Sequence, residues 1–230
     1  MFWINAIVVL LLLISTIFGS EIVSVASERS DIKPQRCVVI DAGHGGVDGG
    51  ATSCTGVLES NLNLDIARRL DDLLHLIGMH TVMIRTEDVS IYTEGESIAA
   101  KKVSDLKKRV QIINDTKNAV LVSIHQNFFG DPRYSGAQVF YAKTEGSDTL
   151  AKEMQRQLVK TLNPDSNRQA KLANGIYLMK NIHCTGILIE CGFISNFAEE
   201  NKLRSDTYQK EICCVIASTL SSFCSRDAIT

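Results

Sequence analysis

The apolar run AVLVSI at residues 119–124 is the feature that most constrains the fold of this chain. A continuous β-rich run without polar alternation is typical of a strand buried on both faces of a parallel sheet. Helical stripes of apolar residues flank it, one beginning at Ser104 and one at 147–162. Strands that alternate with helices predict an α/β fold: one domain with a mostly parallel, twisted sheet and helices on both faces.

The other elements are expected from the same periodicities. Strands are expected at 36–40, 81–85, 136–142, 176–179 and 185–193, and helices at 59–77 and 206–223. The 136–142 strand alternates more clearly and is expected at an edge of the sheet. Residues 86–103 have no clear period, so they are expected to form a long loop, with Ser104 capping the next helix.

The first twenty residues contain no charged side chain, and the apolar stretch Ala6–Phe18 is interrupted only by Ser15 and Thr16. A full membrane span needs about 20 apolar residues, so this stretch favours a signal peptide, with an uncleaved N-terminal membrane anchor as the alternative. Both interpretations place the protein outside the cytoplasm. Residues 21–35 are expected to form a polar linker, and 36–225 the folded domain.

Composition excludes some classes of protein. Lys and Arg (24) nearly balance Asp and Glu (26), and the few aromatic residues are scattered, so nothing indicates a nucleic acid partner. The seven cysteines are odd in number and include no C-x-x-C, which argues against a disulfide framework or a zinc ribbon. Reduced or buried thiols are expected.

A glycine-dense loop, within CVVIDAGHGGVDGGA at 37–51, follows the first expected strand. It nearly matches the dinucleotide-binding pattern G-x-G-x-x-G, but Asp48 stands where the third glycine belongs. The next helix also begins at Glu59 and not within the loop, which argues further against dinucleotide binding. Glycines around His44 would instead allow a ligand to approach the backbone closely.

Three polar residues each follow or close an apolar strand: His44, His125 and Glu190. Ligands of open α/β sheets bind beyond the carboxyl ends of the strands, so these residues are expected to share one site. Two imidazoles and a carboxylate are a common catalytic zinc set. The carboxylate ligand is either Glu190 or Glu59, although Glu59 also suits a helix N-terminus on electrostatic grounds alone.

A zinc hydrolase also needs a carboxylate that takes a proton from water and delivers it to the leaving group. His44, Glu59, His125 and Glu190 together fill the four roles of such a site. The other histidines, His75, His80 and His183, follow no strand and are expected to be structural.

At these residues the sequence resembles the zinc-dependent N-acetylmuramoyl-L-alanine amidases of the amidase-3 type, over about residues 36–223. The resemblance is carried by six ordered motifs, which are VVIDAGHGGVDGGA, Glu59 with Asn63-Leu64, Arg85 with Asp88, Arg109, SIHQN (123–127) and LIECGFISN (188–196).

The resemblance implies one zinc ion held by His44, Glu59 and His125, with Glu190 as the catalytic carboxylate. It implies hydrolysis of the amide between N-acetylmuramic acid and L-alanine in peptidoglycan. Further residues are expected to contact the substrate or support the ligands; they are Asn63, Arg109 and Asn127.

Within the family, the sequence is most similar to the sporulation and germination amidases, through SGAQVFYA, RQAK (168–171) and IYLMKNI (176–182). This similarity implies stem-peptide removal from spore-cortex peptidoglycan, a step toward the muramic-δ-lactam needed for germination. One departure is QNFF at 126–129, where many relatives carry a small residue after the histidine. A larger side chain there is expected to narrow the substrate cleft or to change metal affinity.

The sequence leaves three further matters open. A non-catalytic peptidoglycan-binding or scaffolding protein would keep the same residues as a vestigial metal site. Two histidines and one carboxylate also suit non-haem Fe(II) oxygenases, although these have other folds and need a co-substrate site that is not visible in the sequence. An accessory protein or a second copy of the chain is a candidate partner, and the leader is a candidate membrane contact.

Overall fold

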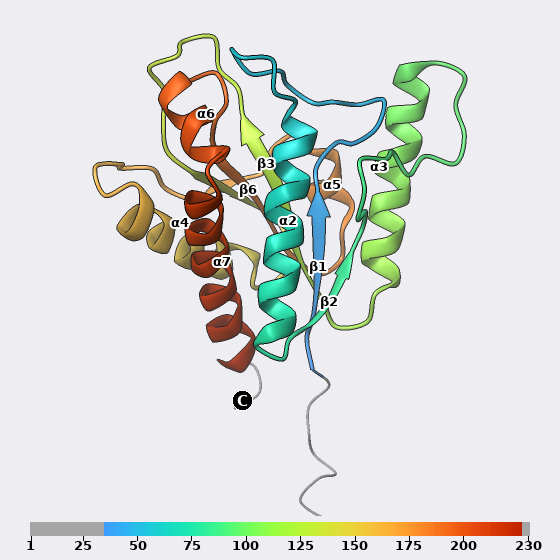
Figure 1. Ribbon diagram of the computed structural model, residues 1–230. Helices are drawn as coiled ribbons and strands as arrows, with labels where there is room; N and C mark the ends of the chain where they lie inside the picture. The colour runs from blue at the N-terminus through green and yellow to red at the C-terminus, as the bar shows by residue number, and fades with distance from the viewer. Residues whose placement is uncertain (1–34, 227–230) are drawn as a thin grey trace, which may run out of the picture. The chain divides into compact units, whose positions relative to one another are not determined.

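The computed structural model describes residues 35–226, so the expected leader and nearly all of the expected linker lie outside the described residues. From Arg36 onward the chain forms one compact unit. Its six-stranded sheet has the order β2-β1-β3-β6-β4-β5, and Figure 1 labels the first four of these strands. The strands are β1 Cys37–Ala42, β2 His80–Met83, β3 Ala119–Asn127, β4 Gln138–Tyr141, β5 Lys171–Leu172 and β6 Thr185–Phe193.

The sheet is mixed but mostly parallel, as the sequence predicts. Strands β2, β1, β3 and β6 are parallel, whereas β4 runs antiparallel to β6. The two-residue strand β5 lies outside β4, so β4 is next to the edge and not at it. The α/β class, the single mostly parallel sheet and the helices on both faces are therefore confirmed.

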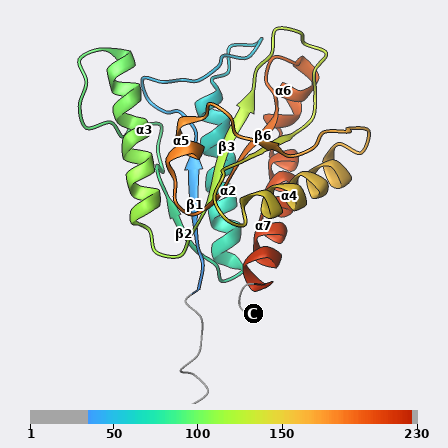
Figure 2. The ribbon, with the colours of Figure 1, turned by 180° about the vertical axis from the view of Figure 1, so that it is seen from behind.

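The helices divide between the two faces of the sheet. They are α2 Glu59–Leu76, α3 Ile98–Asp115, α4 Ser147–Leu162, α5 Tyr177–Asn181, α6 Phe197–Leu203 and α7 Asp206–Arg226. Figure 1 shows α2 and α7 in front of the strands, and Figure 2, from the opposite side, shows α5 over them. No helix within residues 35–226 is long and apolar enough to cross a membrane.

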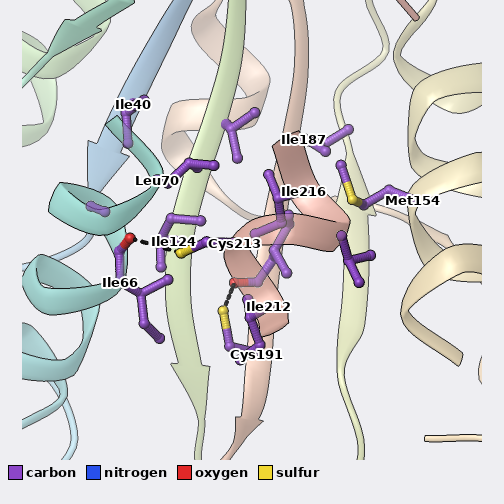
Figure 3. Packing of buried hydrophobic residues seen from close by; sticks show 14 of the residues in the cluster. Ile40, Ile66, Leu70, Ile124, Met154, Ile187, Cys191, Ile212, Cys213 and Ile216 are labelled. Carbon is purple, nitrogen blue, oxygen red and sulfur yellow. Dashed lines mark hydrogen bonds between the residues drawn. The ribbon is translucent and has the colours of Figure 1, made fainter. Parts of the chain in front are cut away.

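The larger core lies between the sheet and helices α2, α4 and α7. Alternate residues of each strand point into it, such as Ile40 from β1, Ile124 from β3 and Ile187 from β6. Figure 3 shows these side chains in one cluster with Ile66 of α2 and Ile216 of α7. Burial of each such side chain stabilises the fold by about 2 kcal/mol. This stabilisation determines which face of each strand points into the core, and therefore where the polar residues at the strand ends point.

Two further local expectations were wrong. Residues 176–179 were expected to form a strand, but 177–181 form α5, whose Leu178 and Met179 pack on the opposite face of the sheet with Leu121. A four-residue apolar run does not distinguish a strand from a short buried helix. The expected loop at 86–103 ends early, because Ser97 caps α3 through a bond from the Ala100 N–H, seven residues before Ser104.

Candidate metal and catalytic site

The structure brings together His44, Glu59 and His125, whose ligand atoms all lie within 4.8 Å of one another. His44 lies two residues beyond β1, Glu59 is the first residue of α2, and His125 lies near the end of β3. His44 Nε2 is 3.3 Å from Glu59 Oε2, and His125 Nδ1 is 2.9 Å from Glu59 Oε1. The two imidazoles meet edge to face, with ring centroids 5.0 Å apart.

Glu59 is held as an ionised carboxylate. The backbone N–H of Ala51 donates to its Oε2 at 3.0 Å, and that of Gln126 donates to its Oε1 at 3.2 Å. Burial raises the pKa of Glu59, but the hydrogen bonds and charges of His125 and His44 outweigh it and hold the pKa far below the ordinary range. The carboxylate is therefore ready to bind a cation between the two rings.

Two glycines leave room for these side chains. A Cβ at Gly43 would lie 2.2 Å from His125 Cε1, and a Cβ at Gly50, whose φ is +69°, would lie 2.6 Å from Glu59 Oε2. His44 itself has a φ of +62°, a conformation that costs a non-glycine residue about 1 kcal/mol or more and is found at functional sites. These two glycines of the loop thus clear the space around His125, Glu59 and His44.

Asp48 orients His44. Its Oδ2 is 2.9 Å from His44 Nδ1, which leaves Nε2 directed at Glu59. Lys102 of α3 forms an ion pair with the same carboxylate at 3.0 Å. A carboxylate bonded to the remote nitrogen of a histidine is the usual support of a metal-ligating imidazole. In the sequence, Asp48 stands out only as the residue in place of the third glycine, although it lies four positions after His44.

Arg109 lies beneath the His44 loop and is almost fully buried. It forms ion pairs with Asp41 and Asp105, both at 2.5 Å, and donates to the carbonyl oxygens of Ala42 at 2.9 Å and His44 at 2.7 Å. Burial lowers the pKa of Arg109, but the two carboxylates outweigh it and raise the pKa. Of the two roles expected for Arg109, this placement fits support of the ligand loop and not substrate contact.

Arg85 supports the same loop from a position just beyond β2. It donates to the carbonyl oxygens of Ala42 at 2.8 Å, Gly43 at 3.1 Å and Ser60 at 2.9 Å. These bonds join the loop that carries His44 to the helix turn that carries Glu59. Arg85 therefore fixes the separation between the His44 loop and the first turn of α2, whereas Arg109 holds the loop itself.

Asn63 and Asn127, also expected near the site, differ in their contacts. Asn63 is fully buried, and its Nδ2 donates to Gly43 O at 3.1 Å and to Glu59 Oε1 at 3.3 Å. Its Oδ1 accepts from Gln126 Nε2 at 3.1 Å, so the large residue after His125 completes this network. Asn127 is half-buried, and its carbonyl accepts from the Ile194 N–H at 2.9 Å.

Glu190 lies beside His125, because the two residues are partners in the β3–β6 ladder. Its Oε2 is buried and has no hydrogen-bond partner among the described residues. Burial raises the pKa of Glu190 to about 7, with the nearby Glu59 acting in the same direction. A buried carboxyl oxygen without a partner costs free energy, so it indicates a function that uses the free oxygen.

The expected structural histidines lie elsewhere. His80 begins β2, His183 precedes β6, and His75 lies in the last turn of α2. All three are therefore at the amino ends of the parallel strands or beside them, at the end of the sheet opposite His44 and His125.

The donor set fits a divalent metal. Two imidazole nitrogens and one ionised carboxylate oxygen converge, His44 and Glu59 each have a further hydrogen-bond partner, and the Glu190 Oε2 atom beside them has none among the described residues. An α/β fold with this cluster at the carboxyl ends of its strands is the arrangement expected of a metal-dependent hydrolase.

Comparison with known proteins agrees with this class. Residues 38–222 match the N-acetylmuramoyl-L-alanine amidase family. The chain is 37% identical to the germination-specific N-acetylmuramoyl-L-alanine amidase of Bacillus subtilis, over 77% of this chain and 75% of that protein. Its fold is similar to that of the CwlD amidase from Clostridioides difficile, solved in complex with the GerS lipoprotein, with a TM-score of 0.80 and 35% identity over 84% of this chain and all of that one.

A second amidase structure from Clostridium difficile 630 is also similar, with a TM-score of 0.73 and 30% identity over 84% of this chain and 98% of that one. The chain belongs to the N-acetylmuramoyl-L-alanine amidase family. It is an enzyme of that activity, and its substrate is peptidoglycan.

Proposed function

We propose that the chain is a zinc amidase of spore-cortex peptidoglycan, with zinc held by His44, Glu59 and His125 and with Glu190 as the catalytic carboxylate. The observation that carries the proposal is the convergence of three ligand atoms within 4.8 Å, next to a carboxyl oxygen without a partner among the described residues. When bound, zinc polarises the amide carbonyl and makes water more acidic.

The residues of the chain supply the remaining chemistry. Glu190 Oε2 accepts a proton from the attacking water as the water oxygen bonds to the lactyl carbonyl carbon. The same oxygen then delivers the proton to the nitrogen of L-alanine as the C–N bond breaks. The stem peptide leaves with a free amine, and N-acetylmuramic acid retains a carboxylate. His44 and His125 are held in place by Asp48 and Glu59 throughout.

The biological setting rests on the relatives. A germination-specific amidase is 37% identical over most of both chains, which supports removal of stem peptides from spore cortex as the step that precedes muramic-δ-lactam. The similar CwlD structure contains a lipoprotein partner, which supports an accessory protein for this chain as well. We place the enzyme outside the cytoplasm, where its substrate lies.

The proposal is tested by comparing the wild type with Glu190→Gln. The glutamine amide fills the same volume as the native carboxyl group but accepts no proton. The variant should therefore bind one zinc as tightly as the wild type and release stem peptide at least about a hundredfold more slowly. Glu211→Gln, which changes an exposed carboxylate on α7, is the matched control and should retain full activity.

The zinc content of each variant is measured by elemental mass spectrometry, and the release of stem peptide is measured by chromatography. Normal turnover by Glu190→Gln would contradict the catalytic role. Binding of peptidoglycan without cleavage by the zinc-loaded wild type would instead favour a scaffolding protein.

A further inference from the structure

A groove of about 930 Å³ opens beside the candidate site and is not used by the chemistry described above. It lies between three segments, at 134–138, 162–171 and 196–202. We call it the Arg168 groove. Its volume is at the upper end of the range for small-ligand pockets, which is enough for a peptide of a few residues.

The Arg168 groove lies beside β6, the strand that carries Glu190. Gln138, which lines the groove, is the ladder partner of Glu190. The Arg168 guanidinium lies 4.9 Å from the ring centroid of Phe193, three residues beyond Glu190 on the same strand. A ligand in the groove is therefore adjacent to the position where the scissile amide must lie.

The groove carries cations that have no acidic partner. Arg168, Lys171 and Lys202 line it, and none of them forms an ion pair with a carboxylate among residues 35–226. Unpaired cations gathered in one concave surface attract an anionic ligand.

Two acidic residues also line the groove, so its lining carries three cations against two carboxylates, and neither carboxylate forms an ion pair with these cations among residues 35–226. Glu199 is buried, and its carboxylate already accepts the backbone N–H groups of Gly136 at 2.9 Å and Phe193 at 2.8 Å. Asp165 is exposed to solvent on the rim.

Arg168 is oriented before any ligand binds. Its Nε donates to Ser135 O at 3.0 Å, and its Nη1 lies 3.5 Å from Gln138 Oε1. Its Nη2 forms no hydrogen bond with the described residues 35–226. A guanidinium stacked on an aromatic ring with a free terminal nitrogen is suited to bind a carboxylate.

We infer that the Arg168 groove binds the carboxylates of the stem peptide and so sets the direction of the substrate across the site. This inference rests on the proposed function. The glycan on the other side of the scissile amide consists of N-acetylated sugars without a net charge, whereas the stem peptide ends in a carboxylate. A cationic groove therefore selects the peptide side and leaves the glycan to extend from the opposite side of Glu190.

The test uses two substrates, an N-acetylmuramoyl tetrapeptide with free carboxylates and the same compound with its carboxylates converted to amides. Arg168→Gln should raise the KM for the acidic substrate about tenfold, because a charge-assisted hydrogen bond is lost, and leave kcat nearly unchanged. The KM for the amidated substrate should change less than about twofold, because no charge pair is present to lose.

Two further variants provide the controls. Lys202 lies on the exposed surface of α6, where substitution does not disturb packing. Lys202→Gln should raise the KM for the acidic substrate by a smaller factor than Arg168→Gln. Lys117→Gln removes an exposed cation at the opposite end of the sheet and should change neither KM. Zinc content and thermal midpoint show whether each variant is folded.

Calorimetric binding of the free tetrapeptide separates this inference from the proposed function, because it needs no turnover. Weaker peptide binding by Arg168→Gln supports the groove even if the enzyme cleaves nothing. Equal binding and equal KM for the acidic substrate in the wild type, Arg168→Gln and Lys202→Gln would overturn the inference while leaving the amidase activity intact. The groove would then be free for another anionic partner, such as an acidic protein surface.

Discussion

Replacement of Asp48 by Asn tests whether the hydrogen bond behind His44 tunes the metal site. In the native chain the Asp48 carboxylate is 2.9 Å from His44 Nδ1, and Lys102 is 3.0 Å from the same carboxylate. The asparagine side chain would keep the size and one acceptor but would lose the negative charge. His44 would then be a weaker donor to zinc and less firmly oriented.

The size of the effect follows from the geometry. Loss of such an outer carboxylate generally costs about tenfold to a hundredfold in metal affinity. The side chains of His44 and Asp48 are 18% and 26% exposed, so solvent screens part of the interaction. We therefore expect the zinc dissociation constant to rise about tenfold, which corresponds to about 1.4 kcal/mol.

The assay is a titration of metal-free protein with zinc in competition with a chromogenic chelator. Asp65→Asn, which changes an exposed residue on the outer face of α2, is the matched control and should leave the affinity unchanged. Lys102→Gln should weaken affinity at most about fivefold, and less at high salt, because its ion pair is half exposed. An unchanged zinc affinity in Asp48→Asn would refute this reasoning.

Three further predictions concern the support of the site. Gly43→Ala should weaken zinc binding more than Asp48→Asn, because the added Cβ would lie 2.2 Å from the His125 ring. Gly130→Ala is the control, because a Cβ there would meet nothing within 4 Å, and it should leave zinc binding unchanged. The same zinc titration measures both effects. Arg109→Met should lower the free energy of unfolding in urea by about 3–5 kcal/mol, since it leaves Asp41 charged and buried, and a loss below about 1 kcal/mol would contradict this. Burial raises the pKa of Asp41, but the interactions with Arg109 and Ser123 outweigh burial and lower the pKa. The Asp41 carboxylate therefore stabilises the folded state above about pH 3.9, and this contribution is lost as the pH falls through the pKa of the folded state. Asp41→Asn should therefore flatten the acid side of the curve of stability against pH, and an unchanged acid limb would argue against this charge pair.

The sequence predicted the elements whose patterns are long and whose termini are marked. Helix α4 was expected at 147–162 and occupies Ser147–Leu162, and α2 was expected to begin at Glu59 and does so. Short elements were predicted poorly. Residues 176–179 and the two-residue strand β5 carry too few side chains for a period to be recognised, and tertiary packing on the sheet decides their form.

The candidate site shows the same division. His44, His125 and Glu190 were recognisable because each is a polar residue at the end of an apolar strand. Apart from the contact between His44 and Asp48, which lie four positions apart, the contacts that support the site were not recognisable, because they join residues far apart in the chain. Arg109 reaches Asp41 across 68 positions, and Gln126 reaches Asn63 across 63 positions. Only the fold brings such pairs together, and no spacing along the sequence predicts them.

The central claim is that Glu190 and the His44–Glu59–His125 cluster hydrolyse the amide between N-acetylmuramic acid and L-alanine. Its most direct test is mass spectrometry of muropeptides after incubation with the zinc-loaded enzyme in water enriched in ¹⁸O. The account predicts stem peptides with a free N-terminal alanine and muramic residues that carry one ¹⁸O in the lactyl carboxylate. Products cut within the peptide or the glycan, or ¹⁸O found only in the peptide, would contradict it.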